Sequence, residues 1–112
     1  MPPCTMFRLT VLYNLPPGSD EAEFLRWRLG EHQQNNAGRP GVLRTDFAVV
    51  ESAWPRGAAP RHRFMTIAEW PDRATFEASF YDPEALARFE ENLKKLDDPV
   101  FLMGEILVSS AG

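Results

Sequence analysis

His32 is the residue of this chain whose type and position best suit proton chemistry. It follows the stretch RWRLGE, residues 26–31, and precedes four amides, residues 33–36. An imidazole titrates near neutral pH, so a histidine at the edge of a pocket can act as a general base or a proton shuttle. A histidine in the last turn of a helix can equally be structural, because the helix dipole and local hydrogen bonds favour it there. The residues alone leave both roles open.

The other candidate residues lack the neighbours that most catalytic or metal sites require. His62 stands between Arg61 and Arg63 at the start of an expected strand and is interpreted as a solvated hairpin residue. No cysteine or carboxylate stands near either histidine at metal-ligand spacing. The serines lie outside a G-x-S-x-G context, and the glycines form neither a phosphate loop nor a dinucleotide fingerprint. We therefore expect no bound metal, no cofactor and no nucleophilic hydrolysis.

The composition predicts a single globular domain over residues 1–112. Of these residues 44% are hydrophobic and 12% aromatic, which is enough material for one core. The net charge is −4 and no basic run occurs, which disfavours nucleic acid and anionic membranes as partners. Cys4 is the single cysteine, so there is no disulfide framework. With no signal-like or membrane-spanning stretch, we expect a cytoplasmic protein.

Apolar periodicity and turn signals predict four strands and two helical regions. Asp20 and Glu23 form a capping box before a first helix that should end near Gly38. The second helical region is broken at residues 81–83, where Asp82 and Pro83 start its second part. The expected strands span residues 6–14, 42–52, 61–70 and 100–110, and the first helix spans residues 20–36.

The resulting order, β-α-β-β-α-β, is typical of the ferredoxin-like α+β fold. In this fold a four-stranded antiparallel sheet carries both helical regions on one face. The second face must then meet solvent, a partner or a ligand. The residues expected there are Leu12, Phe101, Met103 and Leu107, with Phe47 or Phe64 from the hairpin. Such an apolar patch indicates an interface, and a two-fold homodimer with a barrel-like interior would cover it.

Helical spacing separates His32 from the nearby Trp27. At about 100° per residue His32 continues the apolar stripe of Ala22, Leu25 and Leu29, whereas Trp27 lies about 140° away from it. The two side chains can share one pocket wall only if the helix is distorted near Gly30. We therefore expect Trp27 to pack in the core rather than to act with His32.

Several of these features resemble the EthD family of the dimeric α/β-barrel superfamily. A strand and a Pro-rich loop lead to Phe24, Trp27 follows three positions later and His32 eight positions after Phe24, and Pro40-Gly41-Val42 comes next. The segment DDPVFLMGEIL, residues 97–107, is similar to the REDY-like proteins of pigment biosynthesis in the same superfamily. The resemblance spans nearly the whole chain and implies the dimeric barrel fold.

The resemblance also implies a place for His32. The superfamily includes cofactor-independent monooxygenases and polyketide cyclases, beside members with no assigned activity. By resemblance, His32 matches the family histidine beside the cleft between the sheet and the first helix. The family usually continues that histidine into an apolar Pro-Leu type sequence. Because this chain continues with four amides, the mouth of its pocket is expected to be more polar.

Two functional hypotheses follow. In the first, the chain is a cofactor-independent enzyme of oxidoreductase or cyclase type. His32 would transfer a proton on an apolar aromatic or polyketide-like substrate, in a cleft lined by Arg8, Phe47, Phe64 and Met103. In the second, the chain is a non-catalytic binding or accessory protein whose sheet face serves only homodimerisation. A cavity on the order of a few hundred cubic ångströms that His32 reaches would favour the first hypothesis.

Overall fold

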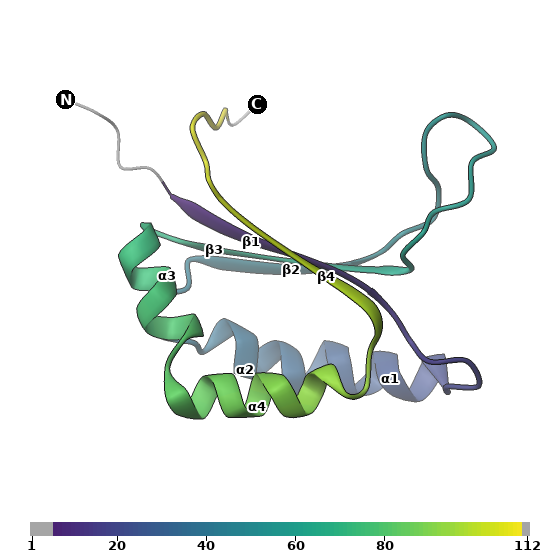
Figure 1. The fold of residues 1–112 in the computed structure, drawn as a ribbon, viewed down its shortest axis with the longest axis horizontal. Coiled ribbons are helices and arrows are strands. Elements are labelled where there is room, and N and C mark those ends of the chain that lie inside the picture. Colours follow the sequence, from purple (N-terminus) through teal and green to yellow (C-terminus); the bar gives the residue numbers. More distant parts are fainter. Residues whose placement is uncertain (1–5, 111–112) are drawn as a thin grey trace.

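A computed structural model describes residues 6–110 and has the predicted ferredoxin-like α+β fold. Four strands form one antiparallel sheet in the order β2-β3-β1-β4, and the helices lie together on one face of it (Figure 1). Cys4 lies outside the described residues. No helix within residues 6–110 is long and apolar enough to cross a membrane. The elements are β1 (Phe7–Asn14), α1 (Glu21–Trp27), η1 (Arg28–His32), α2 (Gln33–Ala37), β2 (Arg44–Val49), β3 (Phe64–Trp70), α3 (Arg73–Phe80), α4 (Pro83–Leu93) and β4 (Asp97–Glu105).

The first helical region begins and ends where the sequence predicts, but it is not one regular helix. The side chain of Asp20 accepts a hydrogen bond from the backbone N–H of Glu23 at 3.1 Å and caps α1. Gly38 follows the last helical residue, as expected. Between these ends, Arg28–His32 forms a π-helical turn, η1. The interruption falls next to the histidine singled out from the sequence.

The predicted start of α4 is confirmed, and the following strand begins earlier than predicted. Asp82 accepts a hydrogen bond from the backbone N–H of Ala85 at 3.1 Å, with a proline in the first turn. The helix ends at Leu93, and β4 begins already at Asp97 instead of residue 100. The segment expected to be a helix stop therefore contains the first residues of a strand.

The core lies between the sheet and the helices. The four apolar residues that alternate along β1 are buried, as predicted, because β1 is a central strand whose one face meets the helices. In the register of the sheet, Phe64 and Trp70 of β3 stand opposite Tyr13 and Phe7. The buried cluster consists of Phe7, Leu9, Val11, Tyr13, Phe64, Ala68, Trp70, Phe76 and Phe80.

The register of β4 corrects the expectation about the second face. Phe101 pairs with Val11 and Met103 pairs with Leu9, two residues that face the helices. The Phe101 ring also packs edge-on against Phe89 of α4, with the ring centroids 4.9 Å apart. Since paired residues share a face of the sheet, the expected placement of Phe101 and Met103 on the second face is wrong. The alternation of side chains along β4 divides its residues between the two faces of the sheet, but it does not determine which of these faces meets the helices.

The second face carries smaller aliphatic side chains than expected. Phe47 and Phe64 both lie on the helix side, where their rings stack with centroids 5.8 Å apart. In the register of the sheet, Leu12 stands beside Met65 and Val100, and Thr10 stands beside Ile67 and Leu102. We call the aliphatic residues Leu12, Met65, Ile67, Val100 and Leu102 the open-face patch.

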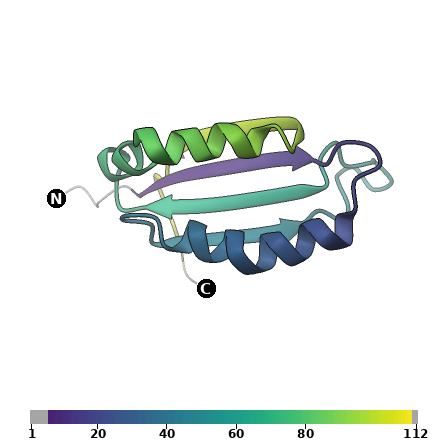
Figure 2. The ribbon, with the colours of Figure 1, turned by 90° about the horizontal axis from the view of Figure 1, so that it is seen from below.

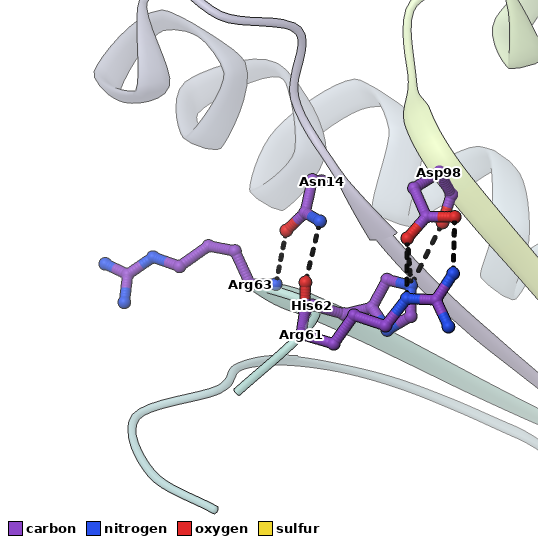
Figure 3. A network of polar contacts seen from close by, with 5 residues as sticks. All are labelled: Asn14, Arg61, His62, Arg63 and Asp98. Carbon is purple, nitrogen blue, oxygen red and sulfur yellow. Dashed lines mark hydrogen bonds and ion pairs between the residues drawn. The ribbon is translucent and has the colours of Figure 1, made fainter. Parts of the chain in front are cut away.

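At one end of the sheet, a polar network joins β1 and β4 to the segment just before β3 (Figure 3). Arg61 donates to both carboxylate oxygens of Asp98 at 2.9 and 3.1 Å, and His62 Nε2 lies 3.0 Å from the backbone carbonyl of Asp98. The amide of Asn14 accepts from the backbone N–H of Arg63 and donates to the carbonyl of Arg61. The side chain of His62 is 10% exposed. His62 is thus not the solvated residue that the sequence suggested but part of a structural clamp.

Replacing Gly41 by alanine should destabilise the fold more than the same change at Gly57. Both glycines have positive φ, 75° and 92°, so each variant strains the backbone. Only at Gly41 would the added Cβ overlap Cγ2 of Thr75 in α3. We expect losses of unfolding free energy of about 1 kcal/mol for Gly57→Ala and about 2–4 kcal/mol for Gly41→Ala. Urea denaturation measures both, and equal losses would contradict the close approach of Gly41 to α3.

Candidate functional site

A cavity of about 350 Å³ lies between the sheet and the helices. Residues of β1 and β3 form its floor, and the first helical region forms one wall. The other wall consists of the end of α4, the segment that follows it and Phe101 of β4. In the view of Figure 2, the first helical region runs in front of β2, and α4 runs in front of β4. The two central strands, β1 and β3, lie between these helices. The volume is typical of small-molecule sites. The aromatic residues of the lining are Tyr13, Phe24, Trp27, Trp70, Phe80, Phe89 and Phe101.

His32 and Trp27 line this cavity side by side. Their rings stack with centroids 4.2 Å apart and an interplanar angle of 27°. In a regular α-helix two residues five apart point about 140° away from each other. The π-helical turn Arg28–His32 is wound by hydrogen bonds that span five residues, which brings such positions to the same side. The expected separation of Trp27 from His32 is therefore wrong, and the distortion includes Gly30.

The imidazole of His32 is neutral at physiological pH. Burial, and then the positive charges of Arg28, Arg39 and Lys95, lower the pKa of His32 to about 4. A histidine stabilised by the negative end of a helix would have a raised pKa instead. The helical region also continues past His32 to Ala37. The stabilisation by the helix dipole that was expected for a last-turn histidine is therefore absent, and the catalytic role of His32 stays a prediction.

Arg28 is the buried charge of the site, and the sequence reading missed it. It is 1% exposed. Its Nη1 donates to Oε1 of Gln33 at 2.7 Å, and its Nη2 donates to Oγ1 of Thr66 at 3.1 Å. The guanidinium carbon lies 4.4 Å from the ring centroid of Phe47. All of these partners are neutral, and Arg28 forms no ion pair with a carboxylate of residues 6–110.

A sequence signal for the burial of Arg28 exists. It follows Phe24 by four positions and Leu25 by three, and both of these residues pack against the core. Helical spacing therefore places Arg28 on the core-facing stripe. Leu29, which the stripe drawn through His32 included, is 62% exposed. The sequence analysis placed the core-facing stripe of the helix through Leu29 and His32, because an arginine is not expected in a protein core.

Gln33 connects the first helical region to the sheet. Its amide oxygen accepts from Arg28, and its Nε2 donates to the backbone carbonyl of Thr45 in β2 at 3.3 Å. The first of the four amides after His32 is thus a structural partner of the buried charge. The interpretation of the amides as a polar helix end is incomplete.

The four other residues predicted to line the cleft lie on both faces of the sheet. Phe47, Phe64 and Met103 are on the helix face. Arg8 is on the second face, where its Nη2 lies 2.7 Å from the carboxylate of Glu69. Among the described residues, the lining of the 350 Å³ cavity includes none of the four. Substrate contact by Arg8, Phe47, Phe64 and Met103 stays a prediction of the sequence.

Two buried polar atoms in the lining have no hydrogen-bond partner among residues 6–110. They are Oγ1 of Thr45 and Nε1 of Trp70. Trp70 is 1% exposed, and a buried donor without a partner costs free energy. The indole N–H of Trp70 is therefore a buried donor without a partner among the described residues. In the same part of the chain no three His, Cys, Asp or Glu side chains gather in a way that could hold a metal ion.

Replacing His32 by glutamine should make the unfolding free energy less dependent on pH below about pH 6.5. The pKa of His32 falls from 6.5 in the unfolded chain to about 4 in the fold. The unfolded state therefore binds the proton first, so the stabilisation is full above about pH 6.5 and is lost as the pH falls toward 4. We expect the wild type to lose on the order of 1–2 kcal/mol of unfolding free energy through His32 over this pH range. This is less than the full pKa shift would give, because His32 is partly solvated.

Urea denaturation at pH 7.0, 5.5 and 4.5 measures this loss. His62→Gln serves as the matched control, since His62 lies in the clamp at the end of the sheet and not in the cavity. A wild-type protein and a His32→Gln variant that lose stability in parallel would contradict the burial of a neutral imidazole.

No family model matches this chain, and no curated protein matches its sequence. Solved structures share its fold at low identity. An EthD family protein from Bacillus halodurans C-125 is 20% identical with a TM-score of 0.71, over 90% of this chain and 98% of that one. The hydroxynitrile lyase of Passiflora edulis is 16% identical with a TM-score of 0.76, over 97% and 100%. SnoaB, a cofactor-independent oxygenase from Streptomyces nogalater, is 15% identical with a TM-score of 0.61, over 95% of each chain. Other structures with this fold are described as dimeric. The resemblance to the EthD family is thereby confirmed at the level of the fold.

Proposed function

We propose that this chain, which has the fold of EthD family proteins, is an enzyme that transfers a proton on a small apolar molecule without a bound cofactor. The observation that carries the proposal is the 350 Å³ cavity that His32 lines as a neutral imidazole. Two proteins of the same fold, the hydroxynitrile lyase and SnoaB, are enzymes by description. They support a catalytic use of this fold.

The lining supports an aromatic or polyketide-like substrate. Aromatic rings come from both walls, with Phe24 and Trp27 on one side and Phe89 on the other. Flat rings pack against such walls by stacking and edge-to-face contacts. The volume is large enough for two fused rings. The proposed substrate is therefore compact and planar.

The chemistry proposed for His32 is removal of a proton from an acidic C–H or O–H group. A neutral imidazole can accept a proton at pH 7, whereas an imidazolium cannot. A pKa near 4 makes His32 a weak base, so the reaction depends on stabilising the anion that forms. The cations that lower this pKa supply that stabilisation. The resulting enolate or phenolate then attacks a carbonyl of the same molecule in a cyclase, or reacts with O₂ in an oxygenase.

The π-helical turn supports the same proposal by fixing the imidazole. The Trp27 ring holds His32 in a stack, and Lys95 Nζ lies 5.3 Å from the centroid of the Trp27 ring. Single π-helical turns inside helices are frequent at functional sites. A catalytic base works best when its orientation is fixed before the substrate arrives.

Replacing His32 by alanine should abolish proton exchange on a bound ketone. We choose 2-tetralone, a bicyclic aromatic ketone with acidic α-protons. In D₂O at pD 7, the wild-type protein should speed α-deuteration above the buffer rate, as measured by ¹H NMR. His32→Ala should lose about 100-fold or more of this acceleration while 2-tetralone still binds.

The control for this experiment is His62→Ala, which should exchange at the wild-type rate. The pH dependence adds a second readout, since the acid limb should fall near pH 4 instead of near 6.5. A His32→Ala variant that exchanges as fast as the wild type would favour the alternative hypothesis. In that alternative the chain is a non-catalytic binding or accessory protein, and His32 only fills space.

We propose further that two copies of this chain associate through the open-face patch. Leu102 is 54% exposed in a single chain, and the patch has only aliphatic side chains. A sheet face of this kind is commonly covered by a second sheet. The dimeric descriptions of structures with this fold support the proposal. Such a dimer leaves the cavity untouched, because the cavity lies on the helix side.

A charge in the patch should therefore separate the two copies. Analytical ultracentrifugation at micromolar concentration should show a dimer for the wild type. Leu102→Glu should raise the dissociation constant about 100-fold or more, because a carboxylate would be buried without a partner. Leu29→Glu, at a 62% exposed position of the first helical region, should remain dimeric. A wild-type monomer at this concentration would refute the association.

A further inference from the structure

We infer that the cavity binds the anion of a planar aromatic acid, and that Arg28 contacts the charged group of this ligand. The inference rests on the proposed function only in taking the cavity as the ligand site. It requires no catalysis. It adds a permanent negative charge to the ligand, placed at one defined residue of the first helical region.

The cavity collects cations that have no carboxylate partner. Arg28, Arg39 and Lys95 line it, and within residues 6–110 none of them forms an ion pair. Most arginines elsewhere are paired with carboxylates. These paired arginines are Arg8, Arg44, Arg61, Arg63 and Arg73. Six arginines and lysines form no ion pair within residues 6–110, and three of them line the cavity, although the chain as a whole carries a net charge of −4. The other three are Arg26, Arg56 and Arg88.

The acidic residues of the lining do not neutralise Arg28. They are Asp20 and Glu23, at the first turn of α1. Asp20 already accepts the capping hydrogen bond from the backbone N–H of Glu23. Along the helix, Asp20 lies eight residues and Glu23 five residues from Arg28, which corresponds to roughly 12 Å and 8 Å. The positive end of the cavity is therefore distinct from its acidic end.

Arg28 is held as a binding residue for an anion would be. Oxygens of Gln33 and Thr66 accept from Nη1 and Nη2, so the guanidinium is fixed in place by neutral groups. The side chain is 1% exposed, and arginine does not lose its proton in proteins. A charge buried among neutral partners is costly unless an opposite charge joins it. A carboxylate in the cavity supplies that charge in the planar geometry that arginine prefers.

The lowered pKa of His32 agrees with an excess of positive charge in this part of the cavity. Burial lowers the pKa of His32 most, and the positive charges of Arg28, Arg39 and Lys95 lower it further. The electrostatic potential at the imidazole is therefore positive. A ligand anion would find a favourable potential over this whole side of the cavity.

The rest of the ligand is set by the other walls. Trp27 and Phe89 offer aromatic faces. A fused two-ring acid satisfies both the apolar walls and the charge. The alternative use of Arg28, as a purely structural residue over the Phe47 ring, predicts no preference between charged and neutral ligands.

Calorimetric titration of the full chain with 2-naphthoate and 2-naphthamide tests the inference. The two probes share their rings and differ in charge at pH 7. The wild type should bind the carboxylate at least tenfold more tightly than the amide. Equal affinities, or no binding of either probe at millimolar concentration, would overturn the inference.

The matched variants are Arg28→Met and Arg26→Met, which remove the same charge two residues apart. Arg26 is exposed on the outer side of the helix, so its variant should keep the tenfold preference. In Arg28→Met the preference should fall to threefold or less. A folded Arg28→Met variant with an unchanged preference would overturn the inference. If this variant does not fold, Arg28→Gln replaces it, since glutamine also removes the charge, and an undiminished preference there counts equally against the inference.

The same titration separates this inference from the proposed function. His32→Ala should keep the preference for 2-naphthoate, since the charge is bound by Arg28. If proton exchange is absent while the preference holds, the anion site stands and the catalytic proposal fails. If exchange is present and the preference is absent, the catalytic proposal stands and the anion site fails.

Discussion

The guanidinium of Arg28 is the point on which the candidate site depends. It lies buried where the first helical region crosses the sheet, and its hydrogen bonds reach Thr66 in β3 directly and β2 through Gln33. A buried charge accepts few arrangements, because each of its donors needs a partner in a defined direction. The sheet, the helix and the amide after His32 are therefore held in one relative position. The cavity wall is built on that position.

The π-helical turn follows at the same place and sets the chemistry. It begins with Arg28 and ends with His32, so one irregular turn carries both the buried cation and the candidate base. Without it, His32 and Trp27 would point in different directions. With it, the imidazole stacks on the indole at the edge of an apolar cavity and loses most of its affinity for protons. Local backbone geometry thus changes both the orientation of the base and its protonation state.

The two faces of the sheet carry different kinds of side chains. The helix face carries the large aromatic residues and leaves a cavity, while the open-face patch is aliphatic and suits a second sheet. The ion pair of Arg8 with Glu69 also lies on the second face, away from His32. The proposed association surface and the cavity therefore lie on opposite faces of the sheet.

Much of the fold could be predicted from local signals. Caps at Asp20 and Asp82 and alternation in β1 define where elements begin and which β1 side chains are buried, because these features depend on neighbours in the chain. The candidate site could be predicted only to the extent of His32. Trp27 and Arg28 were assigned to the wrong places, because the helical spacing assumed a regular α-helix and because an arginine was not expected on the core-facing side.

The sequence by itself determined the order of elements, the helix on which His32 lies and the alternation within each strand. The tertiary structure alone decided which face of β4 meets the helices, since a period of two is symmetric until a neighbouring strand sets the register. It also decided that Arg28 is buried and that His32 stacks on Trp27. Both results come from packing a helix against a sheet, where contacts between distant residues outweigh the regular helical period.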